Sequence, residues 1–362
     1  MKIAIVHDWL TGMRGGEKVL EAMLELFPDA DLYTLFHVKG SVSKTIEKQK
    51  ITTSFLQKFP LLSSHYRYYL PLFPKAIEGL KIKNYDLLIS SSHCVAKGIT
   101  KEAGIPHICY CYTPMRYLWI KTDDYFQKKK NPISHIAFSG ISSHLKTWDL
   151  ASNKKVDRFI AISHAVSERI QRYYQRTADI IYPPVETDQF FISKEIKNDY
   201  LIVSALVPYK KIDLAIHAFN KLGYPLTIVG HGPEENYLRK IAKKNIVFLG
   251  WQSQDHLARL FSQCKAFIFS GEEDFGIAPV EAMASGRPVI AYARGGALET
   301  VTEETGILFK EQTMDSLIEA IFLFEREKRQ FHPEKIRERA LRFDKKIFKE
   351  ELRDYIEKHV SC

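Results

Sequence analysis

The sequence predicts an α/β protein made of two domains, each built around a mostly parallel sheet. Strand-like and helix-like runs alternate almost throughout, which is typical of parallel sheets with crossover helices. A proline-containing connector at residues 182–190 interrupts this alternation, and the chain of 362 residues is long enough for two hydrophobic cores. We therefore expect two Rossmann-like domains that face each other across a cleft, with ligands bound beyond the carboxyl ends of the strands.

The first half of the chain contains the pattern of an open α/β sheet. Its opening run is too short for a signal peptide and is predicted to be the first strand. We expect strands near residues 2–7, 31–36, 85–90, 106–112, 156–162 and 178–182, and helices near residues 16–26, 134–150 and 164–174. Residues 50–80 give no clear pattern.

The second half begins after Pro183 and Pro184, which cannot continue a helix or a central strand. Beyond them the alternation restarts, and residues 313–360 are predicted to be helical. The expected strands are 200–206, 225–229, 246–249, 266–270, 288–292 and 306–309, with helices at 211–221, 234–243, 255–263 and 277–284.

The composition is that of an ordinary globular protein with a basic balance. Hydrophobic residues make up 45% of the chain and charged residues 26%, while the formal net charge is +9. A basic chain favours an anionic partner, which can be a phosphate ligand, an anionic membrane surface or nucleic acid. Nucleic acid is disfavoured, because the basic residues are spread along the chain and no RRM, KH or zinc-finger pattern occurs.

Cysteine usage and hydropathy indicate the compartment. The five cysteines form neither a disulfide framework nor a CxxC metal pair, so we expect reduced thiols in the cytoplasm. No apolar run reaches the ~18 residues of a membrane span. Residues 55–75 interleave aromatic and basic side chains, which suits a lipid-facing surface or, equally, a buried irregular subdomain. We expect a protein peripheral to the inner face of the cell membrane.

The most informative segment is Gly271–Gly286, which places Glu273 and Glu281 eight positions apart. Between them, residues 275–277 form a turn of small and apolar residues that opens a short helix. The N–H groups at a helix start favour phosphate, and a carboxylate one turn further along can accept hydrogen bonds from sugar hydroxyls. The segment therefore predicts a site for a phosphate, a sugar and a ribose. A buried crossover with solvated glutamates is the alternative.

Two other segments of the second domain support an anion site. Lys210 and Lys211 follow a strand and precede a helix, where two cations are unfavourable unless an anion is present. The sequence Gly230–Pro233 follows another strand, and its glycines permit close approach of the backbone. On its own, this glycine turn is a weak signal.

In the first domain, Gly15 and Gly16 open the first helix and allow backbone amides to approach an anion. The chain has neither GxGxxG nor GxxxxGK[ST], which disfavours a dinucleotide dehydrogenase and a P-loop enzyme. The single D-x-D motif, Asp29–Asp31, is predicted to be a turn, so no metal is expected. The segment Cys109–Trp119 ends a strand and enters a helix, and Tyr112 and Arg116 are expected to point toward the cleft; a core strand with an ordinary surface arginine is the alternative.

Together these segments resemble the retaining glycosyltransferases of family four, which have the GT-B fold. The block from Glu273 to Glu281 with Gly276 between them is similar to that family's signature. Three runs resemble the subgroup of bacterial O-antigen and exopolysaccharide mannosyltransferases: His7–Leu10 with Gly15–Lys18, Thr113–Trp119, and Ala205–Lys210.

The resemblance implies a division of labour between the domains. Residues 1–184 would form an acceptor-binding Rossmann-like domain, and residues 185–344 a Rossmann-like domain that binds the nucleotide-sugar donor. The C-terminal helix, at about 345–362, would pack back onto the first domain.

The resemblance also implies roles for individual residues. Glu273 and Lys210 would be catalytic, Glu281 would accept the ribose hydroxyls, and Lys210 would stabilise the departing phosphate. The other donor-binding residues would be Gly16, Ser204, Lys211, Gly232, Trp251, Phe275, Gly276 and Ile277. The residues expected to contact the acceptor or the sugar are Asp8, His93, Tyr112 and Arg116. Two positions depart from the pattern: many relatives have arginine at Ala205 and histidine at Tyr112.

The implied activity is a retaining hexosyltransferase that moves mannose from GDP-mannose onto a lipid-linked glycan during synthesis of lipopolysaccharide or another cell-surface polysaccharide. Retention would follow from front-side attack, in which the leaving phosphate takes the proton of the acceptor. The expected partners are the nucleotide sugar, the glycan acceptor and an anionic membrane, with no cofactor and no metal. A nucleotide-sugar epimerase of the same fold and a non-catalytic nucleotide-sugar-binding protein are the alternatives.

Overall fold

The computed structural model describes residues 1–119, 132–327 and 330–360. These residues form two compact units: unit 1 comprises Met1–Tyr182 together with the chain from Phe348 onward, and unit 2 comprises Pro183–Ile347. The first boundary lies two residues before the one expected from the sequence. Ser361 and Cys362, the last two residues of the expected C-terminal helix, lie outside the described residues.

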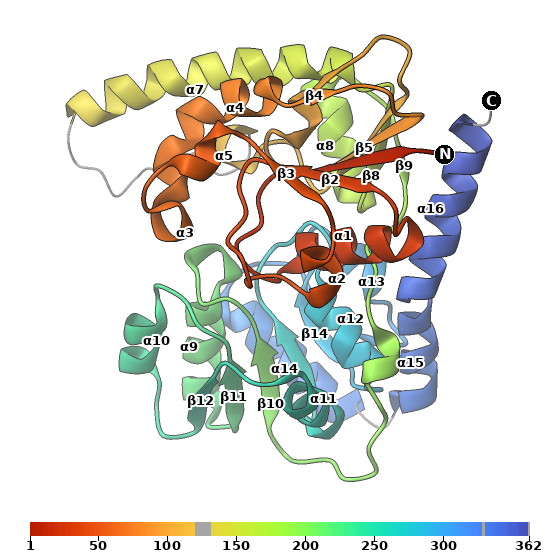
Figure 1. The fold of residues 1–362 in the computed structure, drawn as a ribbon. Helices are drawn as coiled ribbons and strands as arrows, with labels where there is room; N and C mark the ends of the chain where they lie inside the picture. Colours follow the sequence, from red (N-terminus) through yellow and green to blue (C-terminus); the bar gives the residue numbers. More distant parts are fainter. Residues whose placement is uncertain (120–131, 328–329, 361–362) are drawn as a thin grey trace. The chain divides into compact units, whose positions relative to one another are not determined.

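Unit 1 is built around a seven-stranded parallel sheet with the order β3-β2-β1-β5-β7-β8-β9 (Figure 1). Its strands are β1 Ile3–His7, β2 Asp31–Thr34, β3 Ile51–Thr53, β5 Leu87–Ser92, β7 His107–Cys111, β8 Arg158–Ala161 and β9 Ala178–Ile180. All six pairings are parallel. Connections run outward in one direction from β1 and in the other from β5, so the switch point lies between these two strands.

The longer helices of unit 1 lie where the periodicity predicts them, and the short elements were missed. The helices are α1 Gly15–Leu26, α2 Lys44–Glu47, α3 Leu62–His65, α4 Phe73–Gly79, α5 Arg116–Trp119, α7 Pro132–Ser152 and α8 His164–Tyr174. The segment 50–80 consists of β3, two 3₁₀ turns, α3 and α4, each too short to show a period. A separate pair of two-residue strands, β4 Lys81–Ile82 and β6 Thr100–Lys101, completes the unit.

The C-terminal helix α16, Lys345–Val360, contributes most of its length to unit 1. Its Phe348 ring lies 5.7 Å from the Tyr110 ring, which projects from β7. The Tyr355 hydroxyl donates a hydrogen bond of 2.8 Å to the carboxylate of Asp179 in β9. The helix therefore packs on the β7 to β9 side of the sheet.

Unit 2 contains a six-stranded parallel sheet with the order β12-β11-β10-β13-β14-β15. Its strands are β10 Tyr200–Val203, β11 Leu226–Val229, β12 Ile246–Gly250, β13 Phe267–Phe269, β14 Val289–Tyr292 and β15 Gly306–Phe309. In order of appearance this is 3-2-1-4-5-6, the arrangement of a doubly wound nucleotide-binding sheet. Its switch point lies between β10 and β13.

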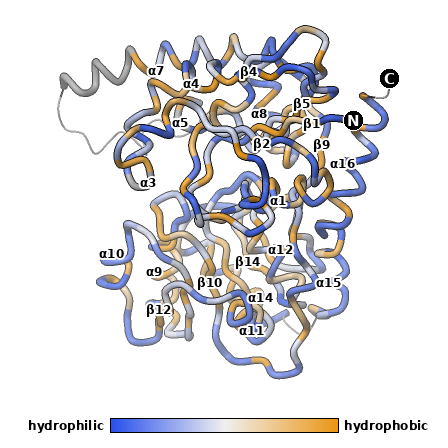
Figure 2. Tube along the Cα trace, in the orientation of Figure 1, coloured by the Kyte–Doolittle hydropathy of each residue, from blue (hydrophilic) through white to orange (hydrophobic). Residues whose placement is uncertain are grey.

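The helices of unit 2 are α9 Ile212–Leu222, α10 Glu235–Ile241, α11 Gln254–Gln263, α12 Ile277–Ala284, α13 Ala297–Thr300, α14 Met314–Glu327 and α15 Pro333–Leu341. The helical run expected over 313–360 is thus divided, with Pro333 starting α15 at a position where its missing N–H costs nothing. Figure 2 shows hydrophobic residues along the sheet and hydrophilic residues on outer helices such as α10. The core of unit 2 centres on Tyr200, whose ring packs against Phe219 and Phe324.

Candidate active site

In unit 2 the loops that follow β10 and β13 bring together the residues singled out from the sequence. The first loop carries Ser204–Lys211 and the second carries Ser270–Gly276. Because parallel strands end at one edge of the sheet, both loops lie at the carboxyl edge on either side of the switch point. This is where open α/β sheets bind their ligands.

The two predicted catalytic residues form an ion pair at this edge. The Lys210 ammonium contacts the Glu273 carboxylate, and their side chains are 15% and 22% exposed. The same ammonium lies 5.4 Å from the centre of the Tyr209 ring. Lys210 is therefore held in place but still accessible to an anion of higher charge.

Close backbone packing fixes the two loops against each other. A Cβ at Gly271 would lie 2.8 Å from the Lys210 Cα, so only glycine allows this approach. The Ser270 hydroxyl donates to the Lys210 and Lys211 carbonyls at 3.2 and 2.8 Å. Lys211 itself adopts φ of +53°, a left-handed conformation that costs a non-glycine residue roughly 1 kcal/mol or more.

The turn before α12 has the form predicted for a phosphate cradle. Gly276 adopts φ of +90° and caps the helix, which begins at Ile277. The Phe275 side chain is buried against Phe343 at a ring distance of 5.4 Å, which leaves its backbone as the part available at the edge. The first N–H groups of a helix have no intrahelical partner and favour an anion. Glu281 lies one turn further along α12 and is largely buried.

The glycine turn after β11 has a packing role. A Cβ at Gly230 would lie 1.9 Å from the Ser204 carbonyl oxygen, and one at Gly232 would lie 2.2 Å from the Leu206 carbonyl oxygen. Both glycines are therefore required for this turn to lie against the loop after β10, whatever they bind. The backbone N–H of Trp251 donates to His231 Nε2 at 2.9 Å, and the indole ring of Trp251 is exposed.

A second glycine pair at this edge was not predicted. Gly295 and Gly296 follow β14, and a Cβ at Gly295 would lie 2.1 Å from the Glu273 carbonyl oxygen. The Gly296 N–H donates to that same oxygen at 2.9 Å. These residues hold the backbone of Glu273. Two adjacent glycines shortly after a strand were the signal that could have revealed them.

The equivalent edge of unit 1 carries a chain of hydrogen bonds that begins in β1. His7 Nδ1 lies 2.9 Å from the Ser91 hydroxyl, which lies 2.7 Å from the Tyr112 hydroxyl. Tyr112 in turn donates to the Gly16 carbonyl oxygen at 2.9 Å. The structure therefore joins Gly16 and Tyr112, and it commits the Tyr112 hydroxyl to the protein. Arg116 lies at the start of α5, half-buried.

Asp8 is fully buried beside this chain, which corrects the expectation that it contacts a ligand. Its carboxylate accepts backbone N–H groups of residues 93–96 at 2.7 to 3.0 Å and also bonds His93 Nδ1 at 2.9 Å. Burial opposes ionisation, but His93, through its ring and its backbone N–H, outweighs it and lowers the pKa of Asp8 to about 2. Both oxygens are thus occupied, and Asp8 positions its neighbours.

Other buried ionisable groups surround this edge. Burial raises the pKa of Glu17, whose carboxylate accepts the Arg14 N–H at the start of α1. Burial lowers the pKa of His7 to about 4, so its ring is neutral near pH 7. These groups are enclosed in the unit and are suited to fixing geometry.

A buried ion pair lies behind the same edge. The Lys97 ammonium donates to the Asp149 carboxylate at 2.6 Å, and the two side chains are 2% and 0% exposed. The other Asp149 oxygen accepts from Trp119 Nε1 at 2.7 Å and from the Tyr174 hydroxyl at 2.9 Å. Lys97 also contacts the Ser152 hydroxyl. This network ties the loop after β5 to α5, α7 and α8.

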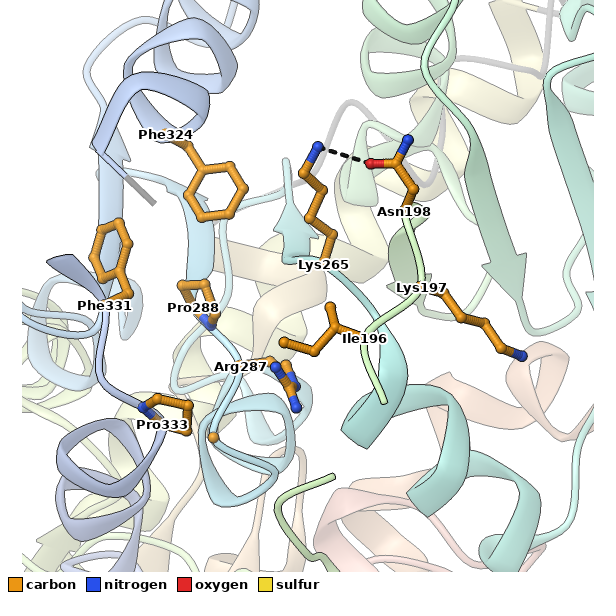
Figure 3. Close-up of a pocket in the computed structure, with 10 residues that line it drawn as sticks. Ile196, Lys197, Asn198, Lys265, Arg287, Pro288, Phe324, Phe331 and Pro333 are labelled. Atoms are coloured by element: carbon orange, nitrogen blue, oxygen red, sulfur yellow. Dashed lines mark hydrogen bonds between the residues drawn. The ribbon is translucent and has the colours of Figure 1, made fainter. Parts of the chain in front are cut away.

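A cavity of about 320 Å³ lies at the opposite, amino edge of the unit 2 sheet, lined by Phe324, Phe331, Lys265 and Arg287 (Figure 3). Lys265 pairs with Glu325, and Arg287 donates to the Ser262 and Ser193 carbonyls at 2.8 and 2.7 Å. Figure 3 shows Lys197 extending away from the rings. The cations here are used to join elements, so this cavity is not the predicted anion site.

Comparison with known families agrees with this architecture. The family Glycosyl transferases group 1 matches residues 185–343, and Glycosyltransferase Family 4 matches residues 15–189. Together they span both units. The structure is similar to that of HepE of Anabaena in complex with UDP, with a TM-score of 0.74 at 16% sequence identity, covering 99% of this chain and 100% of that one.

The two sheets and these matches define a glycosyltransferase with the GT-B fold. More particularly, the chain belongs to glycosyltransferase family 4.

Individual relatives match part of the chain. An uncharacterized glycosyltransferase of Methanocaldococcus jannaschii is 29% identical over 171 residues, covering 46% of this chain and 48% of that protein. The O-antigen chain mannosyltransferase RfbU of Salmonella typhimurium is 32% identical over 155 residues, covering 38% and 43%. The chain thus spans about half the length of these curated relatives. Within the described ranges, the helices lack the combined length and apolar character that a membrane crossing requires.

Proposed function

We propose that this protein is a retaining hexosyltransferase that transfers mannose from GDP-mannose to a lipid-linked glycan. The observation that carries the proposal is the Lys210–Glu273 ion pair at the switch point of the unit 2 sheet, beside the turn that opens α12. Mannose is proposed because the relative RfbU is named as a mannosyltransferase.

In this proposal the unit 2 edge holds the donor. The diphosphate lies against the N–H groups at the start of α12, and Lys210 exchanges Glu273 for the phosphate. Glu273 is then released to accept hydrogen bonds from the sugar hydroxyls, while Glu281 accepts those of the ribose. Charge that develops on the leaving phosphate meets a cation already in position, which is the main way that such sites lower a barrier. The acceptor oxygen attacks the anomeric carbon of the donor sugar from the same face that the phosphate leaves. The leaving phosphate takes the proton of the acceptor hydroxyl.

A lipid-linked acceptor lies at a membrane, so the protein needs a surface that binds the membrane. We propose that residues 48–77 of unit 1 form this surface. Residues 48–77 contain no aspartate or glutamate. Within this segment, exposed apolar side chains alternate with exposed cations: Phe55, Leu61, Tyr68 and Leu72 with Lys58, Arg67 and Lys75. Such a mixture suits the interface of an anionic bilayer, where each cation contributes about 1 kcal/mol.

The donor assignment is tested by thermal unfolding with GDP, UDP, ADP and dTDP. A ligand at 100 times its dissociation constant stabilises the folded protein by ~2.7 kcal/mol. We expect GDP to give the largest shift, whereas UDP, which HepE binds in its crystal, would give the largest shift if the base assignment is wrong.

The reaction is tested by incubating the protein with GDP-mannose, with and without a lipid-linked glycan. We expect GDP release that depends on the acceptor, survives a chelator, and gives a product with the anomeric configuration of the donor. An isomeric nucleotide sugar formed without acceptor would instead establish an epimerase, and binding without turnover would establish a non-catalytic protein.

The membrane surface is tested with vesicles of anionic and of neutral lipid. Replacing two cations, Lys58→Gln with Arg67→Gln, should weaken binding to anionic vesicles by about 2 kcal/mol, roughly 30-fold. The matched control, Lys240→Gln with Lys244→Gln on exposed positions of unit 2, should leave binding unchanged. Equal loss in both variants would show that only the overall charge matters, and binding that does not weaken with salt would show that these cations do not drive it.

A further inference from the structure

We propose that Asp8 fixes the tautomer of His93 so that His93 Nε2 accepts a hydrogen bond from a hydroxyl of the acceptor glycan. This inference rests on the proposed transferase function and names a contact within it. Asp8 is the positioning residue, and His93 is the residue that touches the substrate.

The first step concerns the proton on the ring. The Asp8 carboxylate is ionised and, because it accepts every hydrogen bond that it makes, it has no proton to offer to His93. The bond of 2.9 Å to His93 Nδ1 therefore requires the proton to be on Nδ1. In the neutral ring, Nε2 is then the acceptor.

The second step concerns how firmly the ring is held. The His93 ring packs edge-on against Trp9, with a distance of 4.6 Å between ring centres, and it lies 6.3 Å from the Tyr112 ring. The backbone N–H of His93 also donates to Asp8, so one carboxylate fixes both the main chain and the side chain. The ring has little freedom to rotate.

The third step concerns which atom is available at this edge. The His93 side chain is 32% exposed, and no hydrogen bond to Nε2 occurs within the described residues. The neighbouring candidates are occupied: His7 bonds Ser91, and the Tyr112 hydroxyl bonds Ser91 and Gly16. Nε2 therefore remains for a hydroxyl from outside the protein.

The charged and titratable groups around the ring are compatible with a neutral sugar hydroxyl. Asp8 directly follows β1, Glu17 lies on α1 with Arg14 before it, and His7 and Tyr112 lie at the ends of β1 and β7. Burial keeps His7 neutral near pH 7, and the one cation among these groups, Arg14, interacts with the Glu17 carboxylate. A neutral hydroxyl therefore needs no further charged partner beside the ring.

The experiment compares His93→Phe with the control His144→Phe, which changes an exposed histidine of α7 in the same unit. We expect His93→Phe to raise the KM for the glycan acceptor at least tenfold, to leave kcat within about threefold, and to leave the GDP-induced thermal shift unchanged. An unchanged KM would overturn the inference. If the wild type transfers no sugar to any acceptor, the proposed function fails instead.

A spectroscopic measurement tests the role of Asp8 directly. Nitrogen and carbon spectra of histidine-labelled protein, recorded at mildly alkaline pH, should show the proton of His93 on Nδ1; the resonance is assigned by its loss in His93→Phe. In Asp8→Asn the amide can donate to Nδ1, so the proton should move to Nε2 and the acceptor KM should rise as in His93→Phe. A wild-type proton on Nε2 would overturn the inference, as would an unchanged KM in a folded Asp8→Asn. If Asp8→Asn does not fold, the wild-type tautomer and His93→Phe decide the matter.

Discussion

The carboxyl edges of the two sheets share their topology and differ in how their polar groups are satisfied. Around each switch point the strands follow the same order, with β1 beside β5 in unit 1 and β10 beside β13 in unit 2. At the unit 1 edge, backbone N–H groups satisfy the buried Asp8 carboxylate, and a separate chain of hydroxyl groups ends at the Gly16 carbonyl oxygen. At the unit 2 edge, glycines bring two loops into contact and leave a lysine–glutamate pair partly open.

The difference shows that one topology provides two kinds of site. Buried polar groups that are fully hydrogen-bonded fix geometry and have no capacity left for a ligand. A partly exposed cation beside the first N–H groups of a helix can exchange its partner for an anion. The unit 1 edge is thus suited to positioning one histidine, His93, and the unit 2 edge is suited to binding an anion.

The contrast is sharpest between two lysine–carboxylate pairs. Lys97 and Asp149 are buried and surrounded by further hydrogen bonds, whereas Lys210 and Glu273 are 15% and 22% exposed. We expect the first pair to matter for stability and the second for catalysis. Substitutions at the two pairs test this.

The largest expected effect is on the stability of unit 1. Lys97→Met leaves the Asp149 carboxylate buried without its cation, which should lower the free energy of unfolding by about 3–5 kcal/mol. Tryptophan fluorescence during urea unfolding can measure this, since Trp9, Trp119 and Trp148 are in unit 1.

The matched control is Lys221→Met in unit 2. Lys221 pairs with Asp315 at 3.3 Å, but the two side chains are 60% and 73% exposed, so the loss should be below about 1 kcal/mol. Similar losses in the two variants would show that burial does not distinguish the pairs.

The second effect is on catalysis. Lys210→Ala removes the cation that faces the leaving phosphate, and we expect kcat with saturating GDP-mannose to fall by ~10²–10³. The free energy of unfolding should fall by less than in Lys97→Met, because water still reaches both side chains of this pair. Near-normal turnover of a folded Lys210→Ala, with Lys221→Ala as the unaffected control, would rule out this role.

The sequence was sufficient to predict the long elements and to single out the residues that the structure brings together at the carboxyl edge of unit 2. Helices such as α7 and α8 have several turns of periodicity, and Glu273 and Glu281 lie in one loop and in the helix α12 that directly follows it. Local sequence could not predict that Asp8 is enclosed, because its partners at residues 93–96 lie more than eighty positions away. The same holds for Gly295, which is required by the backbone of Glu273 in another loop.

The third effect is on the pH dependence of unit 1. Burial lowers the pKa values of His7 and His107 from 6.5 to about 4. Between these values the unfolded chain binds protons that the native unit does not, so stability decreases as the pH falls from about 6.5 to about 4. From about pH 7.5 to about pH 5, each histidine should cost about 2 kcal/mol.

Urea unfolding followed by tryptophan fluorescence at both pH values measures this loss. His107→Gln keeps groups that can bond Ser90 and the Lys155 carbonyl, and it should remove about half of the decrease. The same decrease in the variant and the wild type would mean that His107 is already protonated in the native unit.

The smallest expected effect is on donor binding at the unit 2 edge. Glu281 is largely buried in the second turn of α12, where a carboxylate can accept two ribose hydroxyls but lies away from the leaving phosphate. Glu281→Gln retains one acceptor oxygen, so GDP should bind about tenfold more weakly, and its stabilising effect should fall by about 1.4 kcal/mol at a fixed, saturating concentration. The exposed Glu319→Gln on α14 is the control. A fall in kcat at saturating donor, with GDP binding unchanged, would show that Glu281 acts on the reacting sugar and not on the nucleotide. The unit 2 edge would then also position a reacting group, which weakens its contrast with unit 1.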